Sequence, residues 1–177
     1  MVAKFHGGLN RDDPEGRVPS LGEIGLAQFA PYLINRLSAT YNAHLQEALK
    51  QHELTTAKMR ALTILAISPG LTVNELSELA VVEQSTMSRT LDALEVQGLV
   101  RRQSRATDMR VRELHITEAG RSTFAEFWPT LYGLYADLFE GVEAVEYQRF
   151  VETLHKVMRN MDARSASEPR SFRPGEA

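Results

Sequence analysis

The side chains best suited to chemistry lie together in the segment Glu83–Ser104, EQSTMSRTLDALEVQGLVRRQS. Within it, Met87, Leu91 and Leu94 recur at helical spacing and predict the buried stripe of a short helix. Off that stripe lie small polar side chains and one guanidinium, which are Gln84, Ser85, Thr86, Ser88 and Arg89. A helix with this outer face is suited to contact a surface rich in hydrogen-bond donors and acceptors. Gly98 is placed to end the helix as a C-terminal cap.

The chain after this glycine is locally basic. Five arginines fall between residues 98 and 112, namely Arg101, Arg102, Arg105, Arg110 and Arg112, against the single acid Asp108. Two segments, Leu99–Ser104 and Arg110–Ile116, predict strands joined by the polar tip RATD. A basic hairpin of this kind is suited to bind phosphate, although a solvated surface hairpin explains the charge on its own equally well.

Two short helices precede the hairpin. Thr72 and Glu75 form a capping box that opens the helix Val73–Ala80, and the hydroxyl-bearing helix follows after a tight connection. Two such helices followed by a basic hairpin predict a winged helix-turn-helix. Its second helix can enter the major groove of DNA, where Arg89 can pair with guanine, and the wing can reach phosphates or the minor groove. The predicted DNA contacts are Gln84, Ser85, Thr86, Ser88, Arg89, Arg101, Arg105, Arg110 and Arg112.

Apolar stripes predict further helices on both sides of this lobe. One helix runs from Leu33 to Leu49, one begins after Thr117 and should kink at Pro129, and a last one follows Gly141. The predicted fold class is mainly α with a small β wing: a winged helix-turn-helix plus a helical dimerisation region. The expected organisation is a flexible segment at 1–20, a dimerisation helix region at 21–54, the DNA-binding domain at 55–117, C-terminal dimerisation helices at 118–162 and a disordered tail at 163–177.

Composition limits the class of protein. The 177 residues are 43% apolar and 24% charged, which allows one core, or one core and a dimer seam. Because cysteine is absent, disulfides and thiolate metal sites are excluded. The net charge of −3 requires that any phosphate-binding surface be local. We expect a cytoplasmic protein, since no signal peptide or membrane-length apolar run is present.

No residue pattern predicts catalysis, a metal or a cofactor. The chain has no G-x-S-x-G motif, and its histidines are not paired in sequence with a nucleophile. His44 and His52 lie eight residues apart with Glu47 between them, but solvated helix residues explain them better than a metal site does. His115 falls on the second predicted strand, where it is expected to point outward. We therefore predict that the protein is not an enzyme and has no cofactor.

The run Leu71–Gly120 resembles the MarR family of bacterial transcriptional regulators. The matching pieces are QSTMSRTLDALEVQGLV, the wing pattern D-x-R at Asp108 and Arg110, and ITEAG at the end of the second strand. The flanking helices match in order and length, so the resemblance covers roughly residues 21–162. It implies an obligate homodimer whose first and last two helices interlock and whose recognition helices enter successive major grooves. It also implies that Asp108 belongs to the site, as the residue that orients Arg110 for the minor groove.

Three positions depart from the family pattern. Val81 stands in the turn before the recognition helix, where glycine is common, and Glu83 replaces a better-capping aspartate. The wing reads Asp-Met-Arg, so Met109 stands where a second arginine is expected. These differences concern how the recognition helix begins and how the wing meets the minor groove.

The resemblance also implies an effector site, because family members often bind aromatic or phenolic anions between the dimer helices and the DNA-binding lobe. Candidate lining residues are Tyr32, Tyr41, His44, Arg60, Phe124 and Trp128, although an aromatic stripe at helical spacing is also explained by a core. We predict a homodimeric repressor that binds a pseudo-palindromic operator in double-stranded DNA and is released by a small ligand. The alternative is a winged-helix module that meets a protein partner without specific DNA readout. Salt distinguishes the two, because DNA binding weakens steeply as salt rises.

Overall fold

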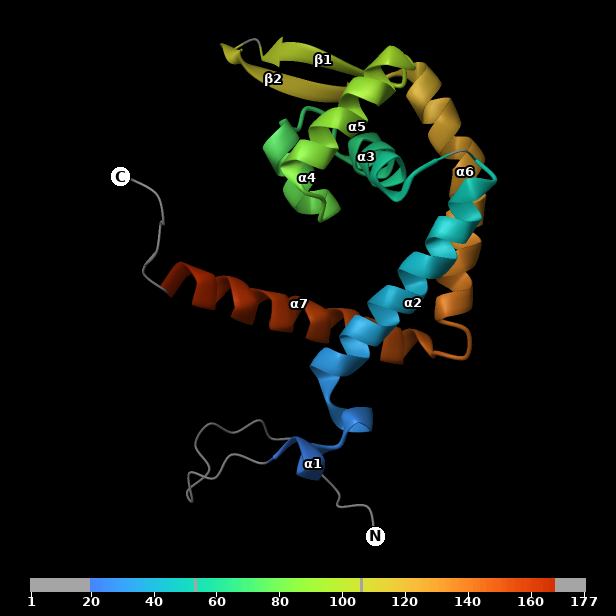
Figure 1. Cartoon of the computed structure of the whole chain (residues 1–177), viewed down its shortest axis with the longest axis vertical. Helices are drawn as coiled ribbons and strands as arrows, with labels where there is room; N and C mark the ends of the chain where they lie inside the picture. Colours follow the sequence, from blue (N-terminus) through green and yellow to red (C-terminus); the bar gives the residue numbers. More distant parts are fainter. Residues whose placement is uncertain (1–19, 53, 106, 168–177) are drawn as a thin grey trace. The chain divides into compact units, whose positions relative to one another are not determined.

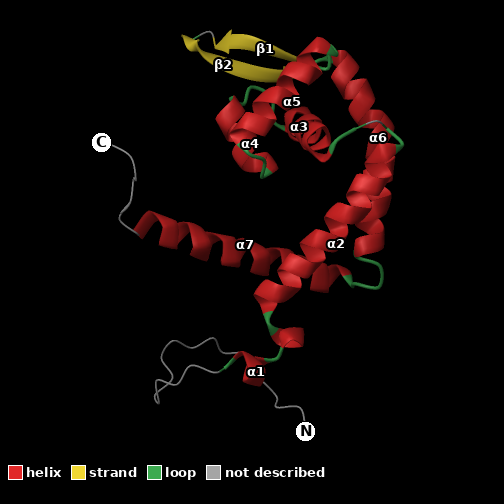
Figure 2. Cartoon of the chain, viewed as in Figure 1, coloured by secondary structure: helices red, strands yellow, loops and turns green. Residues whose placement is uncertain are grey.

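The computed structural model describes residues 20–52, 54–105 and 107–167, with side chains as far as residue 163. This part of the chain is mostly helical and contains one two-stranded antiparallel sheet (Figures 1 and 2). The elements are α1 (Leu21–Ile24), the 3-10 turn η1 (Leu26–Gln28), α2 (Ala30–Lys50), α3 (Thr56–Ile67), α4 (Val73–Ala80), α5 (Gln84–Val96), β1 (Val100–Arg105), β2 (Asp108–Ile116), α6 (Glu118–Leu138) and α7 (Ala144–Ser167). The chain divides after Leu131 into two compact units. The predicted fold class is confirmed.

Threonine hydroxyls begin three of the helices in the first unit. Thr55 Oγ1 accepts the backbone N–H three residues on at 3.2 Å, and Thr117 Oγ1 does the same at 3.0 Å. At α4 the capping box is reciprocal, because Thr72 Oγ1 accepts from the N–H of Glu75 while Glu75 Oε2 accepts from the N–H of Thr72 at 2.7 Å. Each cap satisfies amide groups that a helix start otherwise leaves without partners. The helix starts predicted at Thr72 and Thr117 are confirmed.

The core of the first unit lies among α3, α4, α5 and the sheet, which Figure 1 shows gathered together. The predicted stripe on α5 is buried, since Met87, Leu91 and Leu94 have no accessible surface. They share the core with Leu62, Leu65, Leu76 and Leu114. Burying side chains of this size stabilises the fold by about 1.5–3 kcal/mol each relative to exposing them. The apolar stripe thereby turns the opposite, polar face of α5 towards solvent.

Strands β1 and β2 form the predicted hairpin. Their register runs from Val100 opposite Ile116 to Ser104 opposite Arg112, with an irregularity after Ser104. The pairing then resumes with Arg105 opposite Asp108, so β2 begins two residues before the predicted start at 110. Ala106, in the predicted RATD tip, lies outside the described residues.

The start of α6 packs closely against the start of the hairpin. The N–H of Thr117 donates to the carbonyl of Leu99 at 3.0 Å. A Cβ atom at Gly120 would lie 2.1 Å from the same Leu99 carbonyl oxygen, closer than any side chain can approach. The glycine of the ITEAG motif is therefore required by this contact between backbones.

The second unit contains the end of α6, the turn at Gly141 and α7. The aromatic rings of Tyr135, Phe139 and Tyr147 pack together, with Phe139 and Tyr147 centred 4.9 Å apart in an edge-to-face arrangement. Helix α7 continues to Ser167, beyond the predicted boundary at 162. The remainder of the predicted tail and nearly all of the predicted N-terminal segment lie outside the described residues. Across the described ranges, no helix is long and apolar enough to cross a membrane.

Candidate nucleic-acid interface

The outer face of α5 presents the polar side chains that the sequence singled out. Gln84, Ser85, Thr86 and Arg89 are exposed, and Ser88 is half-buried. The hydrophobic contacts of α5 lie on its opposite side, so these groups project from a rigid helix and not from a loop. Such a face can present hydrogen-bond donors and acceptors to base edges.

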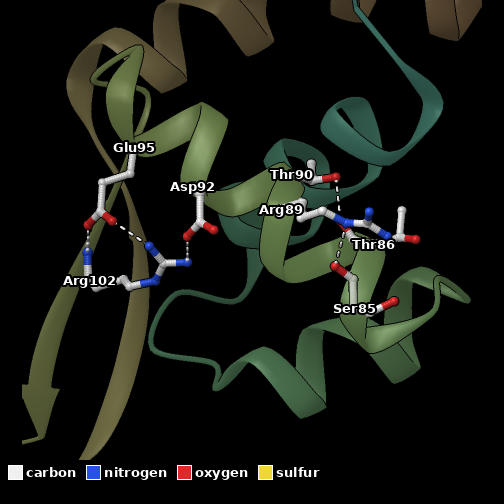
Figure 3. Close-up of polar contacts among 7 residues, drawn as sticks. All are labelled: Ser85, Thr86, Arg89, Thr90, Asp92, Glu95 and Arg102. Carbon is white, nitrogen blue, oxygen red and sulfur yellow. Dashed lines mark hydrogen bonds and ion pairs between the residues drawn. The ribbon is translucent and has the colours of Figure 1, made fainter.

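Two side chains on this face are hydrogen-bonded to the backbone of their own helix, as Figure 3 shows. Arg89 Nε donates to the carbonyl of Ser85 at 3.3 Å, and Thr90 Oγ1 donates to the carbonyl of Thr86 at 2.8 Å. The terminal nitrogens of Arg89 make no hydrogen bond to the residues that the structure describes. The Arg89 guanidinium is thus held along the helix while the atoms that would meet a guanine stay available.

A second cation joins the wing to α5. Arg102 on β1 binds two acids of α5: its guanidinium contacts Asp92 at 2.7 Å and also pairs with Glu95 (Figure 3). Its backbone N–H donates to Glu95 Oε1 at 3.1 Å. Burial lowers the pKa of Arg102, but the hydrogen bonds to both carboxylates outweigh this effect and leave the pKa above its ordinary value. Arg102 therefore joins β1 to α5. The number of arginines in the sequence could not distinguish this structural role from phosphate binding.

A further ion pair lies within the wing. Arg105 Nε donates to Glu113 Oε1 at 2.6 Å, and this hydrogen bond holds the pKa of Glu113 below its ordinary value. Glu113 Oε2 also lies 3.5 Å from His115 Nε2, a buried atom without a hydrogen bond in the described part of the chain. The prediction that His115 is an ordinary surface residue was wrong. Its side chain is only 23% exposed, because the ring lies beside Gly70 at the turn that pairs with β2.

The other predicted contacts are spread along the wing, from Arg101 opposite His115 at its base to Arg110 near its outer end. Arg101, Arg110 and Arg112 are exposed and form no ion pair with the described residues, and Arg101 donates to Gln103. Asp108 Oδ1 accepts a hydrogen bond from the backbone N–H of Arg110 at 3.0 Å. Asp108 therefore orders the backbone at Arg110, and no described bond joins it to the guanidinium. Met109 is 73% exposed between them.

The candidate effector residues do not gather around one pocket. Arg60 lines a pocket of about 530 Å³ that also includes Asn42 and Val81. Tyr32, Tyr41, His44, Phe124 and Trp128 do not line it, and Phe124 and Trp128 instead pack on each other with ring centres 5.5 Å apart. No local pattern identified Asn42 and Val81 as neighbours of Arg60, because they come from α2 and from the turn after α4.

The helical lobe and basic hairpin define a winged helix-turn-helix protein. A family model for MarR matches residues 52–110. A MarR family transcriptional regulator from Silicibacter pomeroyi is 40% identical, with 90% of this chain and 100% of that chain covered and a TM-score of 0.75. A second regulator from Silicibacter pomeroyi DSS is 34% identical over 81% of this chain and 94% of that one, with a TM-score of 0.73. The chain belongs to the MarR family of transcriptional regulators.

The matches also include a family member with a bound small molecule. A MarR family protein from Mycobacterium tuberculosis, solved in complex with salicylic acid, is 27% identical, with 72% of this chain and 94% of that chain covered. Its TM-score is 0.59. That protein binds an aromatic carboxylate.

Proposed function

We propose that this regulator binds a specific DNA operator as a homodimer and acts as a repressor. The observation that carries the proposal is the exposed polar face of α5 beside a wing with three arginines that lack acidic partners among the described residues. The α5 face supplies base contacts, whereas Arg101, Arg110 and Arg112 supply contacts to phosphates or the minor groove. Ser88 and Arg105 contribute less, because the first is half-buried and the second is paired with Glu113.

A homodimer accounts for apolar surface that one chain leaves uncovered. On α2 the side chains of Leu33, Ile34 and Leu37 are exposed, although Leu45 and Leu49 on the same helix are buried. On α7 none of the described side chains is buried, and Phe150, Val157, Met158 and Met161 are exposed. Exposed apolar side chains that recur along a long helix, as on α2 and on α7, are typical of an interface. A two-fold dimer would also present two recognition helices to successive major grooves, about 34 Å apart.

We further propose that a small aromatic or phenolic acid releases the protein from its operator. Arg60 in the pocket between α2 and α3 supplies a cation for such a ligand, and the proposal is supported by one relative that was solved with salicylic acid bound. The ligand can shift DNA binding only by its differential affinity for the bound and released conformations.

A footprint on the DNA upstream of the protein's own gene tests the proposal, repeated with salicylate and related acids. We expect protection of a pseudo-palindromic site of about two helical turns, and we expect this protection to be lost when a ligand binds. Binding to a protein partner with no preference among DNA sequences would instead support an interaction module. If the protection persists with every acid tested, the proposal of ligand control is refuted, while the proposal of operator binding stands.

A further inference from the structure

The connection between α4 and α5 contains a strained residue. Val81 has φ 51° and ψ 51°, and it is the one non-glycine residue with positive φ in the described ranges. Its N–H donates to the carbonyl of Glu78 at 3.1 Å, and the N–H of Val82 donates to the carbonyl of Ser77 at 3.0 Å. This is the backbone of a left-handed helix cap, which glycine usually occupies. A β-branched side chain is costly there, so the surrounding structure must hold the turn in place.

Arg60 on α3 stabilises the turn at Val81. Its Nη1 donates to the carbonyl of Ala80 at 2.9 Å and to that of Val81 at 3.4 Å. Its Nη2 donates to Asn42 Oδ1 on α2 at 3.2 Å. The last carbonyls of a helix lack partners within it and carry partial negative charge, so a guanidinium placed there stabilises both the end of α4 and the turn. Arg60 thus links α2, α4 and the strained residue.

The same guanidinium borders the pocket of about 530 Å³. Its lining contains no acidic side chain, and Ser38, Asn42 and Thr63 add neutral groups that can donate hydrogen bonds. Met59, Ile64 and Leu79 give it an apolar part. A pocket of this size and character suits a small monoanion with an apolar body. Such an anion would draw on the same donors of Arg60 that now bind Ala80 and Val81.

We infer that Arg60 is a positioning residue that holds the left-handed Val81 turn, and that a small carboxylate in this pocket acts by taking Arg60 away from it. The part that concerns the ligand rests on the proposed function. Only residues 81–83 separate α4 from α5, and Glu83 begins α5 without a side-chain cap. A turn released from Arg60 relaxes towards negative φ and displaces the start of α5, where the polar face begins at Gln84. The strain at Val81 therefore makes operator binding sensitive to the partner of Arg60.

A double-mutant cycle without ligand tests whether Arg60 stabilises the Val81 turn. The variants are Arg60→Gln, Val81→Gly and their combination, with Lys58→Gln as a matched loss of charge on the same helix, since Lys58 binds Gln97 and not the turn. Glycine adopts the left-handed conformation without strain, so a turn with glycine at position 81 does not depend on the hydrogen bonds from Arg60. We expect Arg60→Gln to weaken operator binding about tenfold in the wild-type background and less than about threefold beside Val81→Gly. Lys58→Gln, the control, should change operator binding by the same factor in the wild-type background and beside Val81→Gly.

The thermal midpoint provides a second readout that needs no operator. Val81→Gly should raise it, and Arg60→Gln should lower it by a few degrees in the wild type but less in the glycine background. Equal losses in both backgrounds, or no loss in either, would overturn the inference. This holds for operator binding and for the thermal midpoint alike.

Salicylate serves as the probe for the second half of the inference. Calorimetry measures its binding to the wild type and to Val81→Gly, and operator binding is then titrated with it. We expect both proteins to bind salicylate, with the glycine variant keeping its operator at concentrations that release the wild type. If salicylate binds both proteins and releases both from the operator at the same concentration, coupling through the turn is refuted. If neither protein binds salicylate or any related acid, ligand control in the proposed function fails, while the cycle still decides the role of Arg60.

Discussion

Asp108 orders the backbone at Arg110, an arginine that we propose contacts DNA. Its carboxylate accepts the backbone N–H of Arg110 at 3.0 Å and so fixes the chain at the outer end of the wing. Short polar side chains commonly order turns by bonding the backbone two residues on. The resemblance to the family implied that Asp108 orients Arg110, and the structure assigns that effect to the backbone of the arginine.

Substitution of Asp108 separates its hydrogen bond from its charge. Asp108→Ala removes both, and we expect it to weaken DNA binding in the same direction as Arg110→Ala, by about two- to tenfold, because a net hydrogen bond contributes about 0.5–1.5 kcal/mol. Asp108→Asn keeps an accepting oxygen and removes a charge that repels phosphate, so it should bind at least as well as the wild type. Affinity for one duplex, measured by fluorescence anisotropy, checks both. Equal losses in the alanine and asparagine variants would contradict this role.

At the scale of elements, Arg102 fixes the wing against the recognition helix. Asp92 and Glu95 lie one turn apart on α5, and both reach the same guanidinium on β1. Its side chain is 24% exposed, so the pair is partly sheltered from solvent and salt. This contact joins β1 to α5, the two elements that we propose meet one DNA molecule.

Removal of Arg102 should therefore weaken DNA binding even though its guanidinium faces protein. Arg102→Ala leaves two unpaired carboxylates on α5 near the DNA, and we expect about a tenfold loss of operator affinity, as a partner lost from a charged network commonly causes. The triple variant with Asp92→Asn and Glu95→Gln removes the unpaired carboxylates but does not restore the link to the wing, so it should recover only part of that loss. Full recovery in the triple variant would contradict a role of Arg102 in fixing the wing against α5.

The contact between α6 and the hairpin has its own test. Gly120→Ala would place a Cβ atom 2.1 Å from the Leu99 carbonyl oxygen, so either the start of α6 or the start of β1 must move. We expect unfolding to require at least about 1–3 kcal/mol less free energy, the usual cost of overpacking. Gly133→Ala, where a Cβ atom meets nothing within 4 Å, is the matched control and should be neutral or stabilising. Chemical denaturation compares the two. A neutral Gly120→Ala would contradict the close backbone approach.

Local signals in the sequence were sufficient for the elements but not for the contacts between them. Capping at Thr72 and Thr117 and the stripe on α5 depend on neighbours a few residues away, so periodicity and capping rules predict them. The Arg102 pairs join residues seven and ten positions apart on different elements, and the arginine count alone could not identify them. The acids at Asp92 and Glu95, one turn apart on the predicted recognition helix, were the available signal.

At the scale of the whole molecule, the exposed apolar side chains of α2 and α7 support the proposed homodimer. Deletion of residues 141–177 removes α7, whose exposed Phe150, Val157 and Met161 we assign to the dimer seam. We expect the shortened chain to be monomeric or aggregated, and to lose operator affinity because one subunit reaches one half-site only. Analytical ultracentrifugation with full-length protein as control measures this. A stable, operator-binding dimer of the shortened chain would contradict the assignment.

The proposed effector pocket was the part of the molecule least accessible to sequence reasoning. Six residues were chosen by aromatic and cationic character, and only Arg60 lines the pocket described above. The others there, such as Asn42 and Val81, are of types that carry no signal for ligand binding. A pocket formed by three elements depends on their packing, which periodicity within each element does not specify.

The central claim, specific DNA binding through α5 and the wing, is tested most directly by one salt series. Wild type, Arg89→Ala and Arg110→Ala are titrated with a selected operator and with scrambled duplex. We predict that Arg89→Ala loses about 1–3 kcal/mol on the operator and relaxes base preference at one position per half-site. Arg110→Ala should weaken binding to both duplexes and flatten the salt slope by about one counterion per subunit. Unchanged affinity and salt slope in both variants would contradict the account.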